Sequence, residues 1–136
     1  MKKFILLLTI FFIMVSTTGC KEKEKSMILF NADPITLETA MHASHVFDEG
    51  QRIYYLFFTP EKLTTKFVRI QVCKETDLYS SGGCSIVWTC DYRLMKQNMY
   101  YYYNNFTMYK KGRYIMQVFS IDDLAKPLAY NEFWIK

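Results

Sequence analysis

The sequence predicts an all-β fold: an antiparallel β-sandwich of about seven or eight strands, with room for one short helix near residues 37–46. Several segments alternate between apolar and polar residues with a period of two, which is typical of half-buried strands. Turn-forming residues recur about every 8 to 12 positions, as in sandwiches and small barrels. The chain also contains 11 Tyr and 11 Phe, residue types that favour pleated surfaces.

The first residues have the order of a secretion signal. Lys2 and Lys3 precede an apolar run from Phe4 to Val15, and small residues follow it up to Gly19. The run is about a dozen residues long, whereas a helix that crosses a bilayer needs roughly 20. We therefore interpret residues 1–19 as a cleaved signal peptide.

The residues at the predicted cleavage site resemble a known motif. The segment Thr17-Thr18-Gly19-Cys20 resembles the lipobox of bacterial lipoproteins. The resemblance implies that a diacylglycerol is attached to the Cys20 sulfur, that the chain is cut before Cys20, and that the new amine is acylated, for example with palmitate. The alternative is an ordinary signal peptide cleaved nearby, with Cys20 as an incidental thiol.

Residues 20–26 are expected to form a lipidated, charged tether. The stretch from Lys21 to Ser26 reads KEKEKS and contains no apolar residue, so it has nothing to bury in a core. The position after the lipidated cysteine is Lys21 rather than Asp. By resemblance to the enterobacterial sorting rule, this favours the outer membrane, on its periplasmic or surface side, in an organism that has two membranes.

Residues 27–136 are predicted to form a single sandwich domain, since roughly 110 residues suit one modest core. The region 35–47 is ambiguous between a bent strand and a strand that leads into a short helix. Expected strands, the two around Tyr103 being the least certain, are Met27–Phe30, Arg52–Thr59, Lys66–Lys74, Ser85–Tyr92, Met99–Tyr103, Phe106–Tyr109, Arg113–Ser120 and Leu128–Ile135.

One short pattern bears on the type of sandwich. Gly112-x-Tyr114-x-Met116-x-Val118 resembles the penultimate strand of immunoglobulin-like domains, where a Tyr lies two residues before an inward disulfide Cys. The resemblance supports an immunoglobulin-like, transthyretin-like or similar sandwich. Met116 takes the place of that Cys, so the disulfide of that class is not expected. Trp88 is compatible with the core Trp of the class. The resemblance implies no function.

Three cysteines follow Cys20, in a compartment where disulfides form readily. If Lys66–Lys74 and Ser85–Tyr92 form a hairpin, Cys73 and Cys84 lie nearly opposite each other, and we favour a disulfide between them. The pair Cys84 and Cys90 is the second choice. In this arrangement Cys90 shares an apolar face with Ile86 and Trp88 as a buried thiol.

Aromatic residues occur at consecutive positions, which places them on both faces of their strands. One face packs in the core, and the other is left for a partner or for solvent. Tyr offers a rigid apolar body with a polar tip and is favoured at recognition surfaces. The candidate interaction surface comprises Tyr54, Tyr55, Tyr100, Tyr101, Tyr102 and Tyr103. The alternative interpretation is that these residues simply cover a small core.

No catalytic, metal or cofactor signature is recognisable. The chain contains no Gly-rich phosphate loop, GxSxG or HExxH pattern. A metal site that combines the cysteines with His42 or His45 has no standard ligand spacing. The net charge of +4 includes Lys2 and Lys3, and no basic patch indicates nucleic acid. We therefore expect no enzyme, cofactor, metal or nucleic-acid partner.

These expectations favour a lipid-anchored lipoprotein of the bacterial cell envelope that acts as a non-catalytic interaction or structural module. Its partners would be the membrane, through the lipid, and another envelope protein. One alternative is a lipoprotein that binds a small ligand or glycan on its Tyr-rich surface. In size, anchor and expected fold the chain is also similar to the small lipoproteins of type VI secretion membrane complexes, which contact an inner-membrane partner through a protruding loop.

Overall fold

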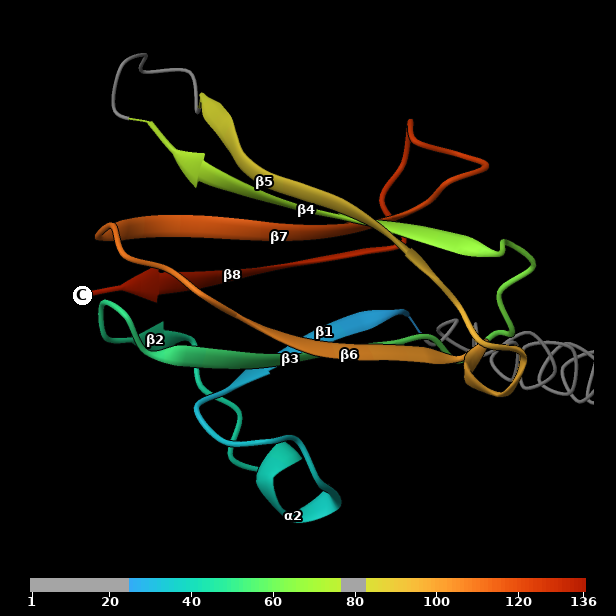
Figure 1. The fold of residues 1–136 in the computed structure, drawn as a ribbon, viewed down its shortest axis with the longest axis horizontal. Helices are drawn as coiled ribbons and strands as arrows, with labels where there is room; N and C mark the ends of the chain where they lie inside the picture. The colour runs from blue at the N-terminus through green and yellow to red at the C-terminus, as the bar shows by residue number, and fades with distance from the viewer. Residues whose placement is uncertain (1–24, 77–82) are drawn as a thin grey trace, which may run out of the picture.

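The computed structural model describes residues 25–76 and 83–136, which form eight strands, one short α-helix and one 3-10 turn. The strands build two sheets that pack face to face (Figure 1). The predicted all-β sandwich with a single short helix is therefore confirmed. The predicted signal peptide, Cys20 and most of the predicted tether lie outside the described residues.

The smaller sheet contains β1 (Met27–Asn31), β3 (Arg52–Phe58) and β6 (Tyr101–Thr107) in the order β1-β3-β6. Both of its pairings are antiparallel. Successive side chains on a strand point to opposite faces, so the alternation along β3 buries Ile53, Tyr55 and Phe57 and leaves the residues between them on the outside.

The larger sheet has the order β2-β8-β7-β4-β5. The short strand β2 (Val46–Phe47) runs parallel to β8, and the other pairings are antiparallel. The remaining strands are β4 (Phe67–Glu75), β5 (Cys84–Arg93), β7 (Gly112–Ser120) and β8 (Ala129–Ile135). A bulge interrupts the β4–β5 pairing between Val72 and Cys73.

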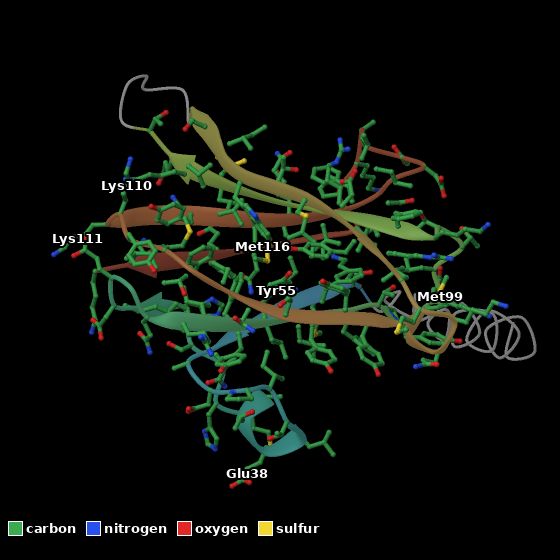
Figure 2. The ribbon with its side chains drawn as sticks, viewed as in Figure 1. Glu38, Tyr55, Met99, Lys110, Lys111 and Met116 are labelled. Atoms are coloured by element: carbon green, nitrogen blue, oxygen red, sulfur yellow. The ribbon has the colours of Figure 1, made fainter. Side chains whose placement is uncertain are left out.

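The core lies between the two sheets and is dominated by aromatic and β-branched side chains. Tyr55 and Met116 are both buried there, one from each sheet (Figure 2). The rings of Tyr114 and Phe133 stack at 5.3 Å. Each large apolar side chain buried in this way contributes about 1.5–3 kcal/mol to stability. The largest fully buried side chains are Ile28, Phe30, Phe47, Ile53, Tyr55, Phe57, Ile70, Tyr114, Met116 and Phe133.

The strand order is that of immunoglobulin-like sandwiches. The order β1-β3-β6 matches strands A-B-E, and β8-β7-β4-β5 matches G-F-C-C′. The buried Tyr114 donates a hydrogen bond from its hydroxyl to the Lys110 carbonyl oxygen at 2.6 Å, as in the tyrosine corner of that class. The prediction for Trp88 was wrong, because Trp88 lies half-buried on the edge strand β5 rather than on β4, the counterpart of strand C.

Two regions differ from the predicted elements. The two strands expected at 99–103 and 106–109 are a single strand, β6, preceded by the 3-10 turn η1 (Lys96–Asn98). The ambiguous region 35–47 contains the helix α2 (Leu37–Ala40) and then β2. Residues 32–45, which we call the arm, leave the smaller sheet and project from the sandwich (Figure 1).

Candidate functional site

The outer face of the smaller sheet carries three cross-strand rows of mostly apolar side chains. One row contains Met27, Phe58 and Tyr101, and the next contains Leu29, Leu56 and Tyr103. The third row contains Asn31, Tyr54 and Asn105. Because the alternate residues of each strand fill the core, these rows face away from it. Phe58 is 41% exposed and Tyr103 is 66% exposed.

The arm is fixed to this face at its base. The Asn31 side chain donates hydrogen bonds to the carbonyl oxygens of Thr39 at 2.7 Å and His42 at 3.5 Å. The backbone N–H of Ser44 donates to the Phe30 carbonyl at 2.9 Å. These contacts hold both ends of the arm against β1 and bury Asn31, which is 6% exposed.

The short helix of the arm is stabilised locally. Thr36 and Thr39 form a reciprocal capping box, in which each side chain accepts from the backbone N–H of the other residue. The helix buries no residue, and Leu37 and Met41 are 95% and 84% exposed. The arm is therefore an ordered projection with two apolar side chains in solvent.

A groove lies between the arm and the sheet. Its volume is about 360 Å³, and its lining is mainly apolar. Tyr101 and Tyr103 line one side with their rings stacked at 6.4 Å and inclined by 21°. Tyr103 also borders a second hollow of about 180 Å³, together with Pro34 and Tyr54. The groove is lined by Ile35, Thr36, Leu37, Ala40, Leu56, Phe58, Tyr101 and Tyr103.

A larger hollow of about 800 Å³ lies at the end of the sandwich where the described chain begins. Lys25, Pro60, Lys126 and Pro127 are among its lining residues, and its surface mixes polar and apolar groups. The groove beside the arm is the better candidate for specific binding, because its stacked tyrosines and apolar floor form a defined recognition surface.

The structure divides the six predicted surface tyrosines between the two faces. Tyr54, Tyr101 and Tyr103 lie on the outer face, and Tyr100 is exposed just before β6. Tyr55 is a correction, because it is 1% exposed in the core and is unavailable to a partner. Tyr102 is also removed from the surface: it is opposite the buried Phe57 and is itself half-buried.

The inward phenols form a cluster near the edge strands β5 and β6. Burial raises the pKa of Tyr55 far above its ordinary value, and the neighbouring Tyr102 and Tyr92 raise it further. Burial also raises the pKa of Tyr92 and Tyr102. The raised pKa values keep these phenols protonated at physiological pH, and their rings pack against one another.

The three cysteines among the described residues occupy different environments, and no disulfide joins them in this structure. The register places Cys73 opposite Ile86 and Cys84 opposite Glu75, so the two cysteines, expected nearly opposite each other, are offset by two residues. Both still lie on the outer face, next to each other across the strands. Burial, followed by the neighbouring Cys73 thiol, raises the pKa of Cys84 to about 12.

The alternative disulfide between Cys84 and Cys90 is excluded by geometry. Both residues lie on the extended strand β5, so they are about 20 Å apart, whereas a disulfide requires Cα atoms within about 7 Å. Cys90 is half-buried opposite the core residue Ile70. The bulge turns Ile86 outward to 59% exposure, so Ile86 does not share the face of Cys90 as expected.

Within residues 25–76 and 83–136, no three His, Cys, Asp or Glu side chains gather closely enough to hold a metal ion. The two histidines weighed as ligands lie on the arm, and the His45 Nδ1 contacts the Glu132 carbonyl oxygen at 2.9 Å. No helix in the same residues is long and apolar enough to span a bilayer.

Comparisons with known proteins add little about function. No protein-family model and no curated protein matches the chain. One structural match is an alkylpurine DNA glycosylase from Pseudomonas fluorescens, bound to DNA with an abasic site analogue. The match covers 80% of this chain and 30% of the glycosylase chain, at 13% sequence identity and a TM-score of 0.39. Another match is a beta-glucosidase from Kluyveromyces marxianus in complex with glucose. This match covers 82% of this chain and 14% of the glucosidase chain, at 13% sequence identity and a TM-score of 0.40. The chain thus spans less than a third of either enzyme, and the low TM-scores carry no inference about its activity.

Proposed function

We propose that this chain is a lipoprotein of the bacterial cell envelope, anchored through a lipid on Cys20, whose sandwich is a non-catalytic protein-interaction module. The single observation that supports the module is the exposed aromatic groove between the arm and the smaller sheet. The anchor is supported by the order of charged, apolar and small residues that ends at Cys20. Lys21 favours the outer membrane in an organism with two membranes.

The occupant that best fits the groove is an apolar segment of another envelope protein. Tyr101 and Tyr103 offer stacked rings with polar tips, and Leu56 and Phe58 supply an apolar floor. Aromatic side chains at the centre of an interface supply a large share of binding energy. The exposed Leu37 and Met41 would extend the contact along the arm.

A narrower form of this proposal is a place in a secretion complex of the type VI kind. The small lipoproteins of those complexes contact an inner-membrane partner through a protruding loop, and the arm is a protruding, locally ordered segment of this chain. Leu37 and Met41 would then be the anchoring side chains.

The groove also supports a second candidate function, the binding of a small amphipathic ligand or glycan. Its volume of about 360 Å³ lies within the range typical of small-ligand sites, about 300 to 1,000 Å³. Native mass spectrometry of the purified protein tests this candidate. A co-purifying small molecule that is lost in Tyr103→Ala would favour the ligand over the protein partner.

The anchor is tested by the mass of the purified protein and by labelling with a fatty acid. We expect Cys20 as the first residue of the mature chain, carrying acyl chains, and we expect Cys20→Ser to abolish the label. An unmodified Cys20 in the membrane fraction would contradict the proposal.

The module is tested by cross-linking and affinity capture of the detergent-solubilised protein. We expect Tyr103→Ala to remove the partner and Tyr130→Ala to retain it, since Tyr130 has almost the same exposure, 68% against 66%, but lies on the opposite outer face. Recovery of monomer alone, or equal behaviour of the two variants, would contradict the proposal.

In an oxidising compartment we further propose a disulfide between Cys73 and Cys84. The two residues are neighbours on one face of the β4–β5 hairpin, and their thiols are close enough to interact. A protein disulfide of the thiol oxidoreductase class would accept the two electrons and two protons of the thiols as it is reduced. Alkylation followed by peptide mass mapping should find one free thiol after Cys20, that of Cys90. Cys90→Ser is the matched control and should leave the cross-linked peptide unchanged; three free thiols would exclude the disulfide.

A further inference from the structure

One end of the sandwich gathers the first described residues and three loops. Met27 pairs with Phe58, and Phe58 pairs with Tyr101, so β1 begins where β3 ends and β6 begins. The loops 59–66, 94–100 and 121–128 meet at this end, which we call the anchor end. Figure 2 places Met99 there, and places Lys110 and Lys111 at the opposite end.

Backbone hydrogen bonds fix the loops at the anchor end. The N–H of Leu63 donates to the Met99 carbonyl at 2.9 Å, and the N–H of Leu94 donates to the Lys66 carbonyl at 2.9 Å. The N–H of Ile121 donates to the carbonyl of Phe67, the first residue of β4, at 3.2 Å. Loops 59–66 and 94–100 are therefore joined to each other, and loop 121–128 begins beside them at the start of β4.

Positive charge is in excess on this surface. Six exposed basic side chains lie at the anchor end, against the three acidic side chains of Glu61, Asp122 and Asp123. The described residues of the opposite end carry a smaller excess, with Arg52, Lys110, Lys111 and Lys136 against Asp48, Glu49 and Glu75, and Lys136 pairs with Asp48 at 3.7 Å. The six basic residues at the anchor end are Lys25, Lys62, Lys66, Arg93, Lys96 and Lys126.

Apolar side chains are exposed among these charges. Met95 is 62% exposed, and Tyr100 and Leu124 are each 45% exposed. Basic groups interspersed with aromatic and long apolar side chains are the composition that lies in the headgroup layer of a membrane. Lysine stems can pass along the apolar layer while their charges reach lipid phosphates.

The length of the tether decides what this surface faces. Five residue steps separate Cys20 from Lys25, and an extended chain covers at most about 3.6 Å per step, or about 18 Å in all. If Cys20 carries the lipid, as the proposed function holds, the start of the described chain stays within about that distance of the bilayer surface. The anchor end is then the part of the domain closest to the lipid.

We infer that the anchor end is a membrane-docking surface for the anionic headgroups of the bilayer in which the Cys20 lipid is inserted. The inference rests on the proposed lipid anchor and adds a second, electrostatic attachment. Lys62, Lys66 and Lys96 contact lipid phosphates, and Met95 and Tyr100 enter the headgroup layer. Docking orients the sandwich on the membrane with the groove at its side, and the Phe58 and Tyr101 end of the groove is then nearest the bilayer.

Hydrogen–deuterium exchange of the full lipidated protein in vesicles tests the inference. Vesicles of phosphatidylcholine alone are compared with vesicles that also contain phosphatidylglycerol. With the anionic lipid, we expect exchange in loops 59–66 and 94–100 to slow by about fivefold or more. The turn around Lys110 and Lys111 should be unaffected.

Two matched double variants separate docking from general attraction. Lys62→Glu/Lys96→Glu should abolish the slowing, whereas Lys110→Glu/Lys111→Glu makes the same change of charge at the opposite end and should retain it. Met95→Ser/Tyr100→Ser should weaken the slowing without a change of charge. Equal exchange in the two lipid mixtures, or equal behaviour of the two charge variants, would overturn the docking inference.

Measuring the mass of the protein in the same preparation distinguishes a failure of the docking inference from a failure of the proposed lipid anchor. A lipid on Cys20 together with unprotected loops overturns docking and leaves the anchor standing. An unmodified Cys20 overturns the anchor itself, and with it the distance limit on which docking rests.

Discussion

The two outer faces of the sandwich differ in whether paired charges lie among their exposed apolar side chains. On the larger sheet, Arg69 makes a two-pronged contact with Asp91 across neighbouring strands at 2.7 and 2.9 Å. Arg113 pairs with Glu132 at 2.6 Å and lies over the Trp134 ring at 5.6 Å from its centroid. On the smaller sheet, the corresponding rows contain Met27, Leu29, Leu56, Phe58, Tyr101 and Tyr103.

The difference shows how each face relates to water. The larger sheet also exposes Ile86, Tyr130 and Trp134, but paired charges that stay hydrated lie among them. The apolar side chains of the smaller sheet cannot hydrogen-bond to water. Burying them against a partner would contribute about 25 cal/mol for each Å² of apolar surface removed from water. A contiguous exposed apolar patch of this kind usually marks an interaction site.

The largest effect is expected from a matched pair of adjacent residues on β3. Phe57 is fully buried, and Phe58 is 41% exposed on the outer face. Phe57→Ala should lower the free energy of unfolding by about 3 to 5 kcal/mol, because it leaves a cavity. Phe58→Ala should cost less than about 1 kcal/mol. Urea unfolding measures both; equal losses would mean that the outer rows are structural rather than available for binding.

A second pair compares one hydroxyl group in the core with one on the outer face. Tyr114→Phe removes the hydrogen bond to the Lys110 carbonyl and should lower stability by about 1 to 2 kcal/mol. Tyr103→Phe removes an exposed hydroxyl and should leave thermal stability unchanged. A lower melting temperature for Tyr103→Phe would show that the Tyr103 hydroxyl makes a contact that stabilises the fold.

The smallest effect concerns the ion pairs of the larger sheet. Hydrogen bonding to Arg69 lowers the pKa of Asp91, so the pair contributes stability above the ordinary pKa of Asp and loses it as pH falls through the lowered value. Asp91→Asn should therefore be slightly less stable than the wild type at about pH 7 and equal to it in strong acid. The melting temperatures of the wild type and Asp91→Asn, measured across pH at low and high salt, check this. If the difference between the two proteins stays the same in acid, the ion pair is not the cause of that difference.

The strands that face the core on one side could be predicted from the sequence. Lys66–Lys74 and Arg113–Ser120 alternate cleanly, since every second residue is buried, and they agree with β4 and β7 to within one residue. The pattern around Tyr114 was also recognisable in the sequence, although the hydrogen bond from its hydroxyl to the Lys110 carbonyl was found only in the structure.

The faces of the aromatic runs could not be predicted. Four consecutive tyrosines carry no alternation, so nothing in the run from Tyr100 to Tyr103 indicates which members are buried; the register with β3 decides it. The bulge after Val72 shifts the β4–β5 register by one residue and turns Ile86 and Cys84 outward, which brings Cys84 onto the face of Cys73. The groove depends on the hydrogen bond from the Asn31 side chain to the Thr39 carbonyl oxygen, which holds the arm beside the sheet. No local sequence pattern predicts this contact.

The position of β1 has a mechanical consequence. The chain enters the sandwich through this edge strand, and all five of its residues pair with β3. A force between the membrane and a partner bound to β3 and β6 would act along the direction of β1. The hydrogen bonds between β1 and β3 would then bear this force together rather than one at a time. The Asn131 side chain, which donates to the Ile28 carbonyl at 2.7 Å, ties the same strand to the other sheet. With the proposed anchor and the proposed partner on the groove, β1 would carry tension between them without peeling from β3.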